Sequence, residues 1–505
     1  MQILEQRFLR GPNVHADSPC LLSVVDLQDL YGKSTKDLPG FNHALLELLP
    51  SLHGERLPAG QPGGFAQRLR EGTYLGRVIE HVTLELQTLA GAPASFGRTR
   101  PVNGHPGQFR IVCAYSCEKL AEPAFDLALD LVTALAHGEG FELAPRLEEL
   151  REIAGRYAIG TSTGAVIAAA QERGIPVQRI TDEANLFLLG WGVRQKRLQA
   201  TTTGDTSFIA VKIASDKQLT KALLKEAGVP VPEGDVVTTV ESAQRVARRL
   251  NGPVTLKPLD GNQGKGVTVD CNTPDDVARA FEFARQYGRR IIVERHVKGC
   301  DYRVLVAGGR VAAASRRRPA HVVGDGVRTV RELVEIENAN PARGAGHATI
   351  LTRIALDEHA ADMLSRQGFE FDSVLPVGVV AELRGNANLS TGGTAEDVTD
   401  LLPDSTRLLC VRAASKIGLD VAGIDIVCED IGQPLAAQRG AVIEVNAAPG
   451  IRMHQYPSAG EARDAGEAIV DGLMGASDGR IPVIALTGTN GKTTTTMLVA
   501  HAARM

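Results

Sequence analysis

Three oxygen-bearing side chains late in the chain have a spacing that suits a divalent cation. Asp425 lies inside the apolar run 421–427, and Glu444 and Asn446 lie two residues apart in the run 441–446. Residues two apart point to the same face of a strand, and a carboxylate in mid-strand is costly to bury without a partner. Mg²⁺ ions that bridge nucleotide phosphates take such oxygen ligands. We therefore predict that Asp425, Glu444 and Asn446 hold one or two Mg²⁺ ions.

A phosphate-binding segment precedes these side chains. Lys257 lies in the short apolar run 253–258, which has the character of a buried strand, and a glycine-rich turn follows at once. Glycine lets backbone amides approach phosphate oxygens closely, and Lys257 can reach the same phosphates. The predicted contacts in the turn are Gly261, Gly264, Lys265 and Gly266.

The next predicted strand, 291–297, supplies contacts to the rest of a nucleotide. Glu294 can accept a hydrogen bond from an adenine amine or a ribose hydroxyl, Val297 lies at the end of the run, and Asp301 follows as a ribose ligand. A glycine-rich turn alone has a high false-positive risk. The joint order of lysine, glycine turn, glutamate and late carboxylates is much harder to obtain by chance, and it predicts an ATP site.

This order resembles the ATP-grasp superfamily over roughly residues 160 to 475. The resemblance implies that ATP phosphorylates a carboxylate, that an amine then attacks the acyl phosphate, and that Lys217 contacts the nucleotide. Its D-alanine ligase-like members carry an arginine two residues before the metal-binding aspartate, where this chain has Gly423. The group that stabilises the developing oxyanion must therefore come from elsewhere, and the candidates are Arg303, Arg318 and Arg452.

The three consecutive arginines 316–318 are a further feature of this region. Guanidinium groups bind carboxylates in a bidentate manner, so the run can recognise an acidic substrate. The alternative is a solvated run of charge with no ligand.

A second phosphate-binding loop lies at residues 487–496, after a predicted strand at 483–486 and before a predicted helix. Backbone amides and the helix N-terminus cradle phosphate in such loops, the lysine adds charge, and the next hydroxyl ligates Mg²⁺. The predicted contacts are Gly488, Gly491, Lys492 and Thr493. The sequence given ends before the rest of a nucleotide-binding domain.

The order of these parts resembles the cyanophycin synthetase family, whose members place an ATP-grasp module before a Mur ligase-like module. The segments 198–207, 423–427 and 444–457 carry the same resemblance. We therefore expect a multidomain α/β and α+β protein with an N-terminal α/β domain at 1–158, an ATP-grasp domain at 159–478 and the truncated start of a Mur ligase-like P-loop domain at 479–505.

The resemblance implies a ligase that builds a branched polypeptide without a ribosome. The ATP-grasp site would add aspartate to the C-terminal carboxylate of a growing polymer primer, and the Mur-like site would join arginine to each aspartate β-carboxylate. It also implies a homo-oligomer, often a tetramer. The alternatives are polymerisation of β-Asp-Arg dipeptides or of other acidic and basic residues, a small-molecule ligase of the glutathione or D-alanine type, and a polymer-binding relic without activity.

A helix predicted at 78–89 carries part of a hydrolase motif. Inverted zinc hydrolases read His-x-x-Glu-His on a helix, and some members of the family resemble that pattern, but here Arg77 stands in the first histidine's place, before Glu80 and His81. We therefore expect no zinc here, and a polar helix face that helps to hold a polymer.

Composition narrows the functional class. Aromatic residues make up 4% of the chain and the net charge is -4, which gives no electrostatic or stacking case for nucleic acid. No apolar run approaches the length of a membrane span. The seven cysteines are scattered and odd in number, which fits a reducing, cytoplasmic compartment.

Overall fold

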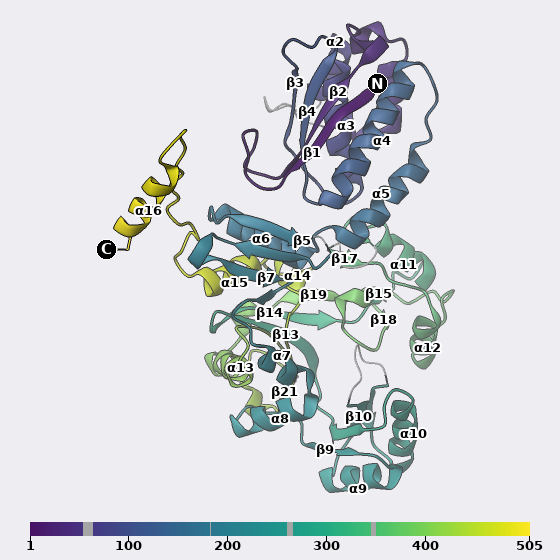
Figure 1. Cartoon of the computed structure of the whole chain (residues 1–505). Helices are drawn as coiled ribbons and strands as arrows, with labels where there is room; N and C mark the ends of the chain where they lie inside the picture. Colours follow the sequence, from purple (N-terminus) through teal and green to yellow (C-terminus); the bar gives the residue numbers. More distant parts are fainter. Residues whose placement is uncertain (54–63, 182, 260–265, 345–349, 505) are drawn as a thin grey trace.

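The computed structural model describes residues 1–53, 64–181, 183–259, 266–344 and 350–504. Its N-terminal part is a four-stranded antiparallel sheet in the order β1-β2-β4-β3, with helices on one face (Figure 1). Strand alternation sends Leu21 and Ile111 towards the helices and Leu22 and Val112 to the other face. The elements are β1 (Gln2–Leu9), β2 (Cys20–Asp26), β3 (Gly97–Pro101), β4 (Gln108–Ala114), α1 (Phe41–Leu48), α2 (Gly64–Glu71), α3 (Leu75–Leu89), α4 (Glu118–Ala136) and α5 (Leu143–Tyr157).

A small antiparallel sheet of order β5-β6-β7-β8 follows. Phe187 of this sheet packs in one hydrophobic cluster with Leu305 and Val421 of the next, larger sheet, and helices α6 and α15 contribute to the same cluster. The small sheet therefore packs against the larger sheet, which carries the candidate site. Its elements are α6 (Thr161–Glu172), β5 (Val177–Thr181), β6 (Leu186–Leu189), β7 (Lys196–Gln199), β8 (Thr202–Thr203) and α15 (Ala465–Met474).

The central layer is a five-stranded antiparallel sheet in the order β19-β14-β13-β20-β21. One face packs on helices α7, α8 and α13 through a core that includes Val304, Ile424 and Ile426. The residues that alternate with these, among them Arg303 and Asp425, therefore point to the opposite face. The elements are α7 (Phe208–Ser215), α8 (Lys217–Glu226), β13 (Cys300–Ala307), β14 (Arg310–Arg318), β19 (Thr394–Asp397), α13 (Asp404–Ile417), β20 (Val421–Cys428), β21 (Ala441–Asn446) and α14 (Arg452–Gln455).

Two smaller units flank the central layer. One is a four-stranded sheet of order β11-β10-β12-β9 with its own core beneath two helices: β9 (Gly234–Val237), α9 (Val240–Leu250), β10 (Val254–Pro258), β11 (Thr268–Cys271), α10 (Pro274–Arg285) and β12 (Ile291–Arg295). The other is an extension between β14 and β19 with a separate core: β15 (His321–Val323), α11 (Val330–Asn338), β16 (Arg343–Gly344), β17 (Leu351–Thr352), α12 (Glu358–Arg366) and β18 (Val380–Glu382).

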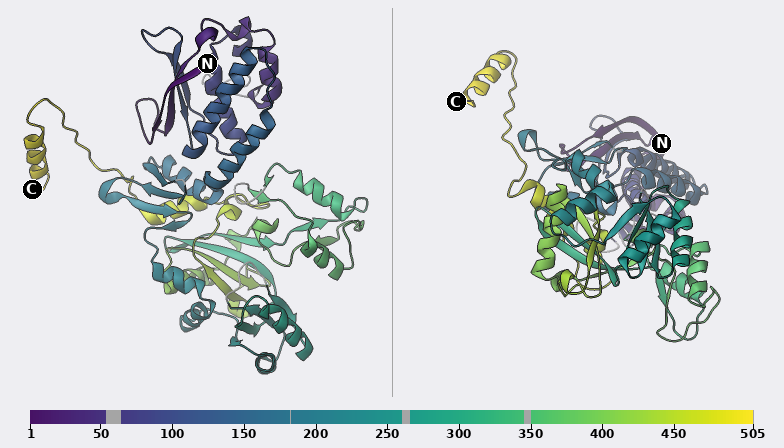
Figure 2. Two further views of the ribbon diagram at one scale, coloured as in Figure 1. Left: turned by 45° about the vertical axis from the view of Figure 1, so that its right-hand side comes forward. Right: turned by 90° about the horizontal axis from the view of Figure 1, so that it is seen from below.

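The last segment of the chain stands away from the remainder (Figure 2). Helix α16 (Lys492–Ala502) forms where a helix is predicted, but residues 483–486 form no strand, so that prediction is wrong for this structure. A strand needs a neighbour to satisfy its backbone groups, and Val483 and Ile484 are exposed here. The linker before this segment is bound to the residues after β6, because the Trp191 amide donates to the Gly479 carbonyl at 2.8 Å.

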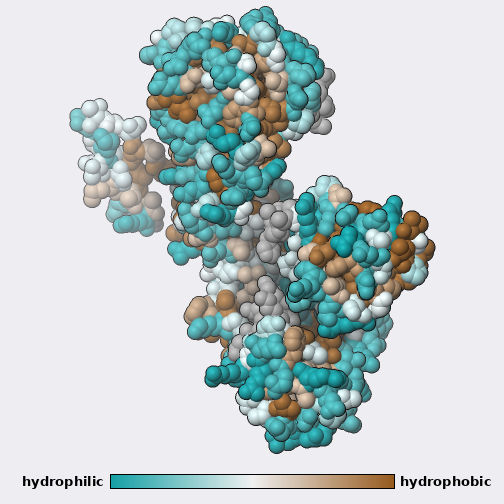
Figure 3. All heavy atoms as spheres, turned by 90° about the vertical axis from the view of Figure 1, so that its right-hand side faces the viewer, coloured by the Kyte–Doolittle hydropathy of each residue, from teal (hydrophilic) through white to brown (hydrophobic). Residues whose placement is uncertain are grey.

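On the face of the molecule that Figure 3 shows, hydrophobic residues form separate patches among hydrophilic ones. No helix among the described residues is long and apolar enough to cross a membrane.

Candidate active site

One row of paired residues crosses the face of the central sheet opposite helices α7, α8 and α13. From β19 to β21 the Cα partners are Asp397, Ser315, Arg303, Asp425 and Glu444. Antiparallel pairing places directly opposite side chains on one face. The fold therefore brings an arginine, an aspartate and a glutamate from three separate parts of the chain into contact range.

Asp425 is the centre of this row and is held by two arginines. Arg303 binds it with two nitrogens, one of them Nη2 at 3.1 Å from Oδ2, and Arg317 Nη2 lies 3.4 Å from the same oxygen. Burial opposes the charge of Asp425, but the two guanidinium groups outweigh it and lower the pKa of this carboxyl. Asp425 is therefore an anion in a buried, cationic setting.

The predicted metal ligands lie side by side on β20 and β21. Asn446 Nδ2 is 3.3 Å from Asp425 Oδ2, and Glu444 is the direct register partner of Asp425. Glu444 makes no ion pair among the described residues. Its charge opposes the lowering of the pKa of Lys257 by burial, and it adds to the effect of Asp425, which raises the pKa of Arg303 against burial. The described residues hold no group of three or more His, Cys, Asp or Glu side chains that could bind a metal ion, so a cation here would take two carboxylates and an amide.

The packing around position 423 explains why this residue is a glycine. A Cβ at Gly423 would lie 2.8 Å from Pro449 Cβ and 3.1 Å from Arg303 Cδ. The side chain of Arg303, which comes from the neighbouring strand, passes over Gly423. Arg303 therefore fills the space that a side chain at position 423 would need, and it stays one of the three oxyanion candidates.

A buried carboxylate joins two lysines near the predicted nucleotide site. Glu294 is 3% exposed and contacts Lys257 Nζ at 2.7 Å, and Lys221 Nζ contacts its other oxygen. Burial, with help from Lys257 and Lys217, lowers the pKa of Lys221 to about 6, and burial and Lys217 lower the pKa of Lys257 to about 8. In this structure Glu294 therefore engages lysines rather than facing an open adenine pocket.

Lys221 is a residue that the sequence analysis missed. Lys217 begins helix α8, and Lys221 lies one turn later on the same side of that helix. The charge of Lys217 acts on both other lysines, so all three belong to one region. The i, i+4 spacing of two lysines was the available signal.

The other predicted nucleotide contacts are placed as follows. Gly261, Gly264 and Lys265 lie outside the described residues. Gly266 has φ +71°, and a Cβ there would lie 2.7 Å from Tyr287 Cδ2, so glycine is required. Val297 lies between β12 and β13.

Asp301 shares the site face of β13 with Arg303. Arg317 Nη2 lies 3.8 Å from Asp301 Oδ1. Burial raises the pKa of Asp301, with Arg317 acting in the opposite direction. The carboxylate of Asp301 therefore lies beside the row that contains Asp425, on the same face of the sheet.

A cavity of about 320 Å³ adjoins the row, and its lining includes Arg303, Arg317 and Arg452. Arg452 is 6% exposed and donates from Nη2 to Thr352 Oγ1 at 3.1 Å. Arg318 does not line this cavity. It points to the other face of β14, where it pairs with Glu396 at 3.4 Å. Arg317, its neighbour in the same arginine run, lines the cavity instead, and the role predicted for Arg318 stays a prediction.

The terminal loop has two glycines with positive φ before helix α16. Gly488 and Gly491 have φ +155° and +76°, and Gly491 immediately precedes α16. Lys492 donates from Nζ to the Gly488 and Thr489 carbonyls, the latter at 3.4 Å. Thr493 follows in the first turn of the exposed helix.

The altered zinc motif forms internal contacts in α3. Glu80 is 2% exposed and accepts from Thr99 Oγ1 at 2.6 Å, while Arg77 Nη1 lies 3.9 Å away. His81 stacks on Phe65 with ring centroids 4.0 Å apart. These contacts give the polar helix face a structural role, and the prediction that no zinc binds here stays a prediction.

Comparison with known proteins places these features in context. Residues 22–137 match the cyanophycin synthase-like N-terminal domain, and residues 214–324 match the RimK-like ATP-grasp domain. The chain is 43% identical to the cyanophycin synthetase of Nostoc sp. over 508 residues, which is 99% of this chain and 56% of the relative. It is also 43% identical to that of Synechocystis sp. over 510 residues, 99% of this chain and 58% of the relative.

Among solved structures, the bifunctional glutathione synthetase from Pasteurella multocida is similar in fold. The TM-score is 0.51 at 29% sequence identity, covering 70% of this chain and 52% of that one. The mixed α/β multidomain class and the ATP-grasp fold are thereby confirmed. The chain spans little more than half the length of the curated relatives that it matches.

Proposed function

From the similarity of this chain to the cyanophycin synthetases over nearly its whole length, we propose that it is an ATP-dependent ligase that extends a non-ribosomal polypeptide. The observation that carries the proposal is the row of Arg303, Asp425 and Glu444 beside an arginine-lined cavity. Such a site places positive charge where a carboxylate is to be activated.

ATP would lie between the lysine cluster and this row. Lys217, Lys221 and Lys257 would supply charge for its phosphates, Gly266 would let the backbone approach them, and Asp301 would contact the ribose. Mg²⁺ would be held by Asp425, Glu444 and Asn446, a set that fits its preference for oxygen ligands. The ion supplies neutralisation of phosphate charge during transfer.

The cavity would hold the reacting carboxylate. Arg303 and Arg317 are anchored by Asp425 and yet line the cavity, so each can present its remaining donors without moving. Arg452 adds a third guanidinium from α14. These arginines neutralise the acid and then the acyl phosphate, which the amine of the incoming amino acid attacks.

The finer substrate assignment is also part of the proposal. The ATP-grasp site would activate the C-terminal carboxylate of a growing primer and add aspartate, and a Mur-like module that starts at 479 would add arginine to the β-carboxylate. Residues 1–158 would bind the polymer, and the assembled protein would be a cytoplasmic homo-oligomer. The related alternative, polymerisation of β-Asp-Arg dipeptides, uses the same first site.

The test is ADP release from Mg-ATP in the presence of aspartate and a short polymer primer. The proposal expects release that requires both, and a product whose mass rises by aspartate units. Free amino acids in place of the primer are the control for a small-molecule ligase of the glutathione type. Turnover that ignores the primer would overturn the polymer assignment while keeping the ATP-grasp chemistry.

A further inference from the structure

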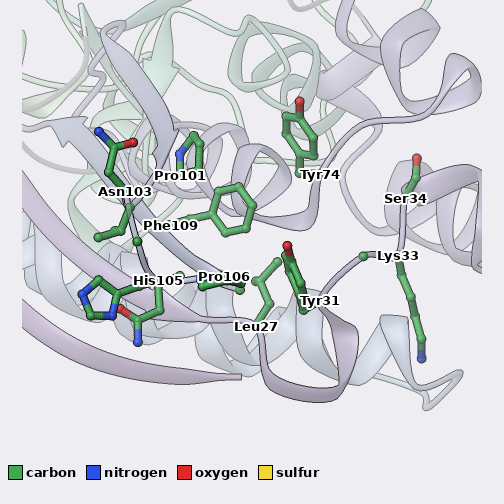
Figure 4. Close-up of a pocket in the computed structure, with 15 residues that line it drawn as sticks. Leu27, Tyr31, Lys33, Ser34, Tyr74, Pro101, Asn103, His105, Pro106 and Phe109 are labelled. Atoms are coloured by element: carbon green, nitrogen blue, oxygen red, sulfur yellow. The ribbon is translucent and has the colours of Figure 1, made fainter.

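Two cavities among the described residues differ in the side chains of their walls. The larger, of about 640 Å³, lies in the N-terminal part and is lined by aromatic rings such as those of Tyr31 and Phe109 (Figure 4). The smaller, of about 320 Å³, is lined by the guanidinium groups of Arg303, Arg317 and Arg452. A carboxylate pairs with such cations, so the elements that aim these three arginines determine how tightly an acid binds.

Arg452 differs from the other two arginines in how it is supported. Arg303 and Arg317 are anchored by Asp425, but Arg452 begins helix α14, which has only four residues. A helix of one turn has no stability of its own. The position of α14 must therefore come from its contacts with the rest of the fold.

Backbone groups attach both ends of α14. The Ile451 amide donates to Ser162 Oγ at 3.1 Å, and the Arg463 amide donates to the His454 carbonyl at 2.8 Å. Arg463 in turn binds Asp397, a member of the row, with Nη2 at 2.7 Å from Oδ2. The two ends of the turn are therefore attached to the fold before any side chain of α14 is considered.

The side chain of His454 attaches the same turn to the central sheet. It is fully buried, and its Nδ1 lies 2.8 Å from Ser315 Oγ. Ser315 is also fully buried and lies in the row between Asp397 and Arg303. His454 and Arg452 are two residues apart in one turn, so a shift of the imidazole also moves the guanidinium group.

Packing alone does not explain a histidine at position 454. Among the described residues its Nε2 has no hydrogen-bond partner, and an unmatched buried nitrogen lowers stability where an apolar side chain would not. Burial and Arg303 lower the pKa of His454 to about 3, with Arg317 acting in the same direction and Asp397 against them. The ring is therefore neutral. What it contributes is a directed bond to Ser315, which an apolar residue lacks.

We propose that His454 is a positioning residue, which through its bond to Ser315 holds α14 so that Arg452 keeps its place in the cavity wall. The inference rests on the proposed function in one respect, namely that the cavity binds the carboxylate to be activated. Because Arg303 and Arg317 stay anchored by Asp425, loss of the His454 bond weakens binding of the acid more than it slows the chemistry.

The first measurement separates KM from kcat for the primer in ADP release. His454→Leu should raise the primer KM about two- to tenfold, the range that one neutral hydrogen bond supports, and should change kcat by less than about twofold. His454→Asn keeps a polar atom at the δ position and should restore the KM of the parent. Ser315→Ala should reproduce the rise seen in His454→Leu, and the double variant should show no further rise, because both changes remove one bond.

The second measurement needs no turnover. The full chain without ATP is treated with phenylglyoxal, which modifies guanidinium groups, and the labelling of Arg452 is followed by mass spectrometry. Arg452 is 6% exposed, so release of α14 in His454→Leu or Ser315→Ala should speed its labelling about two- to tenfold. His321→Leu is the matched control and should leave the rate unchanged, because the His321 ring bonds the Pro319 carbonyl of its own segment at 2.8 Å.

Three results would overturn the proposal. One is labelling of Arg452 at the parent rate in both His454→Leu and Ser315→Ala. Another is faster labelling with an unchanged primer KM, since Arg452 would then not act on the acid. The third is a His454→Asn variant that behaves like His454→Leu. Faster labelling in a chain that shows no turnover would support the positioning role and refute only the proposed function.

Discussion

Asp425 and Glu444 are neighbours in the same row, yet replacing each should have a different effect on stability. Asp425 is bound by Arg303 and Arg317, whose side chains are 12% and 9% exposed. In Asp425→Asn both guanidinium groups lose their buried counter-charge, and such a loss costs about 3–5 kcal/mol. Glu444 has no ion pair among the described residues and is only half-buried, so Glu444→Gln should change the free energy of unfolding by less than about 0.5 kcal/mol.

Trp191 provides the assay, because it is the chain's single tryptophan. It follows β6, whose Phe187 and Leu189 share a core with Leu305 and Val421 of the central sheet. The urea midpoint of the Trp191 transition should therefore fall for Asp425→Asn and stay unchanged for Glu444→Gln. ADP release should be lost in both variants.

Two results would refute this reasoning. An Asp425→Asn protein as stable as the parent would mean that the arginines do not depend on this carboxylate. Normal turnover in Glu444→Gln would remove Glu444 from the metal site while leaving the fold intact.

Three further experiments test other parts of the site. Nucleotide binding at pH 8 should take up on the order of one proton, because phosphate favours the charged forms of Lys221 and Lys257 whose pKa values are lowered to about 6 and about 8. Calorimetry in buffers of different ionisation enthalpy measures this proton uptake. The Lys221→Met variant should take up fewer protons. An unchanged uptake would mean that Lys221 does not respond to the bound nucleotide. Gly423→Ala should lower ADP release at least tenfold by displacing Arg303, with primer KM as the second readout, and a fully active variant would show that Arg303 has room to move. Arg317→Ala should reduce turnover far more than the matched variant Arg318→Ala, and equal losses would contradict the placement of the two side chains on opposite faces of β14.

Much of the site was accessible from the sequence because its parts are short-range patterns. The spacing of Glu444 and Asn446 and the mid-strand position of Asp425 follow from strand alternation. The partners of Asp425 could not be obtained in this way, since they depend on which strands pair. Arg303 and Asp425 form an ion pair although they are 122 residues apart in the sequence, and no local sequence pattern predicts such a pair.

The faces of the three arginines 316–318 also depend on strand pairing. A strand sends Arg317 to one face and Arg316 and Arg318 to the other. Only the register with β13 and β19 decides which face belongs to the site. Similarly, residues 483–486 have the apolar character of a strand, but no neighbouring strand pairs with them here.

The central claim is that the primer's terminal carboxylate is phosphorylated before the amine attacks it. A primer labelled with ¹⁸O in its C-terminal carboxylate tests this directly. It is incubated with the protein, Mg-ATP and aspartate, and the mass of the released phosphate is measured by mass spectrometry. The account predicts one ¹⁸O atom in the phosphate released with the first aspartate added to each primer, and none in later additions, which activate the carboxylate of unlabelled aspartate. Phosphate that carries no label, from a reaction that still lengthens the primer, would contradict it.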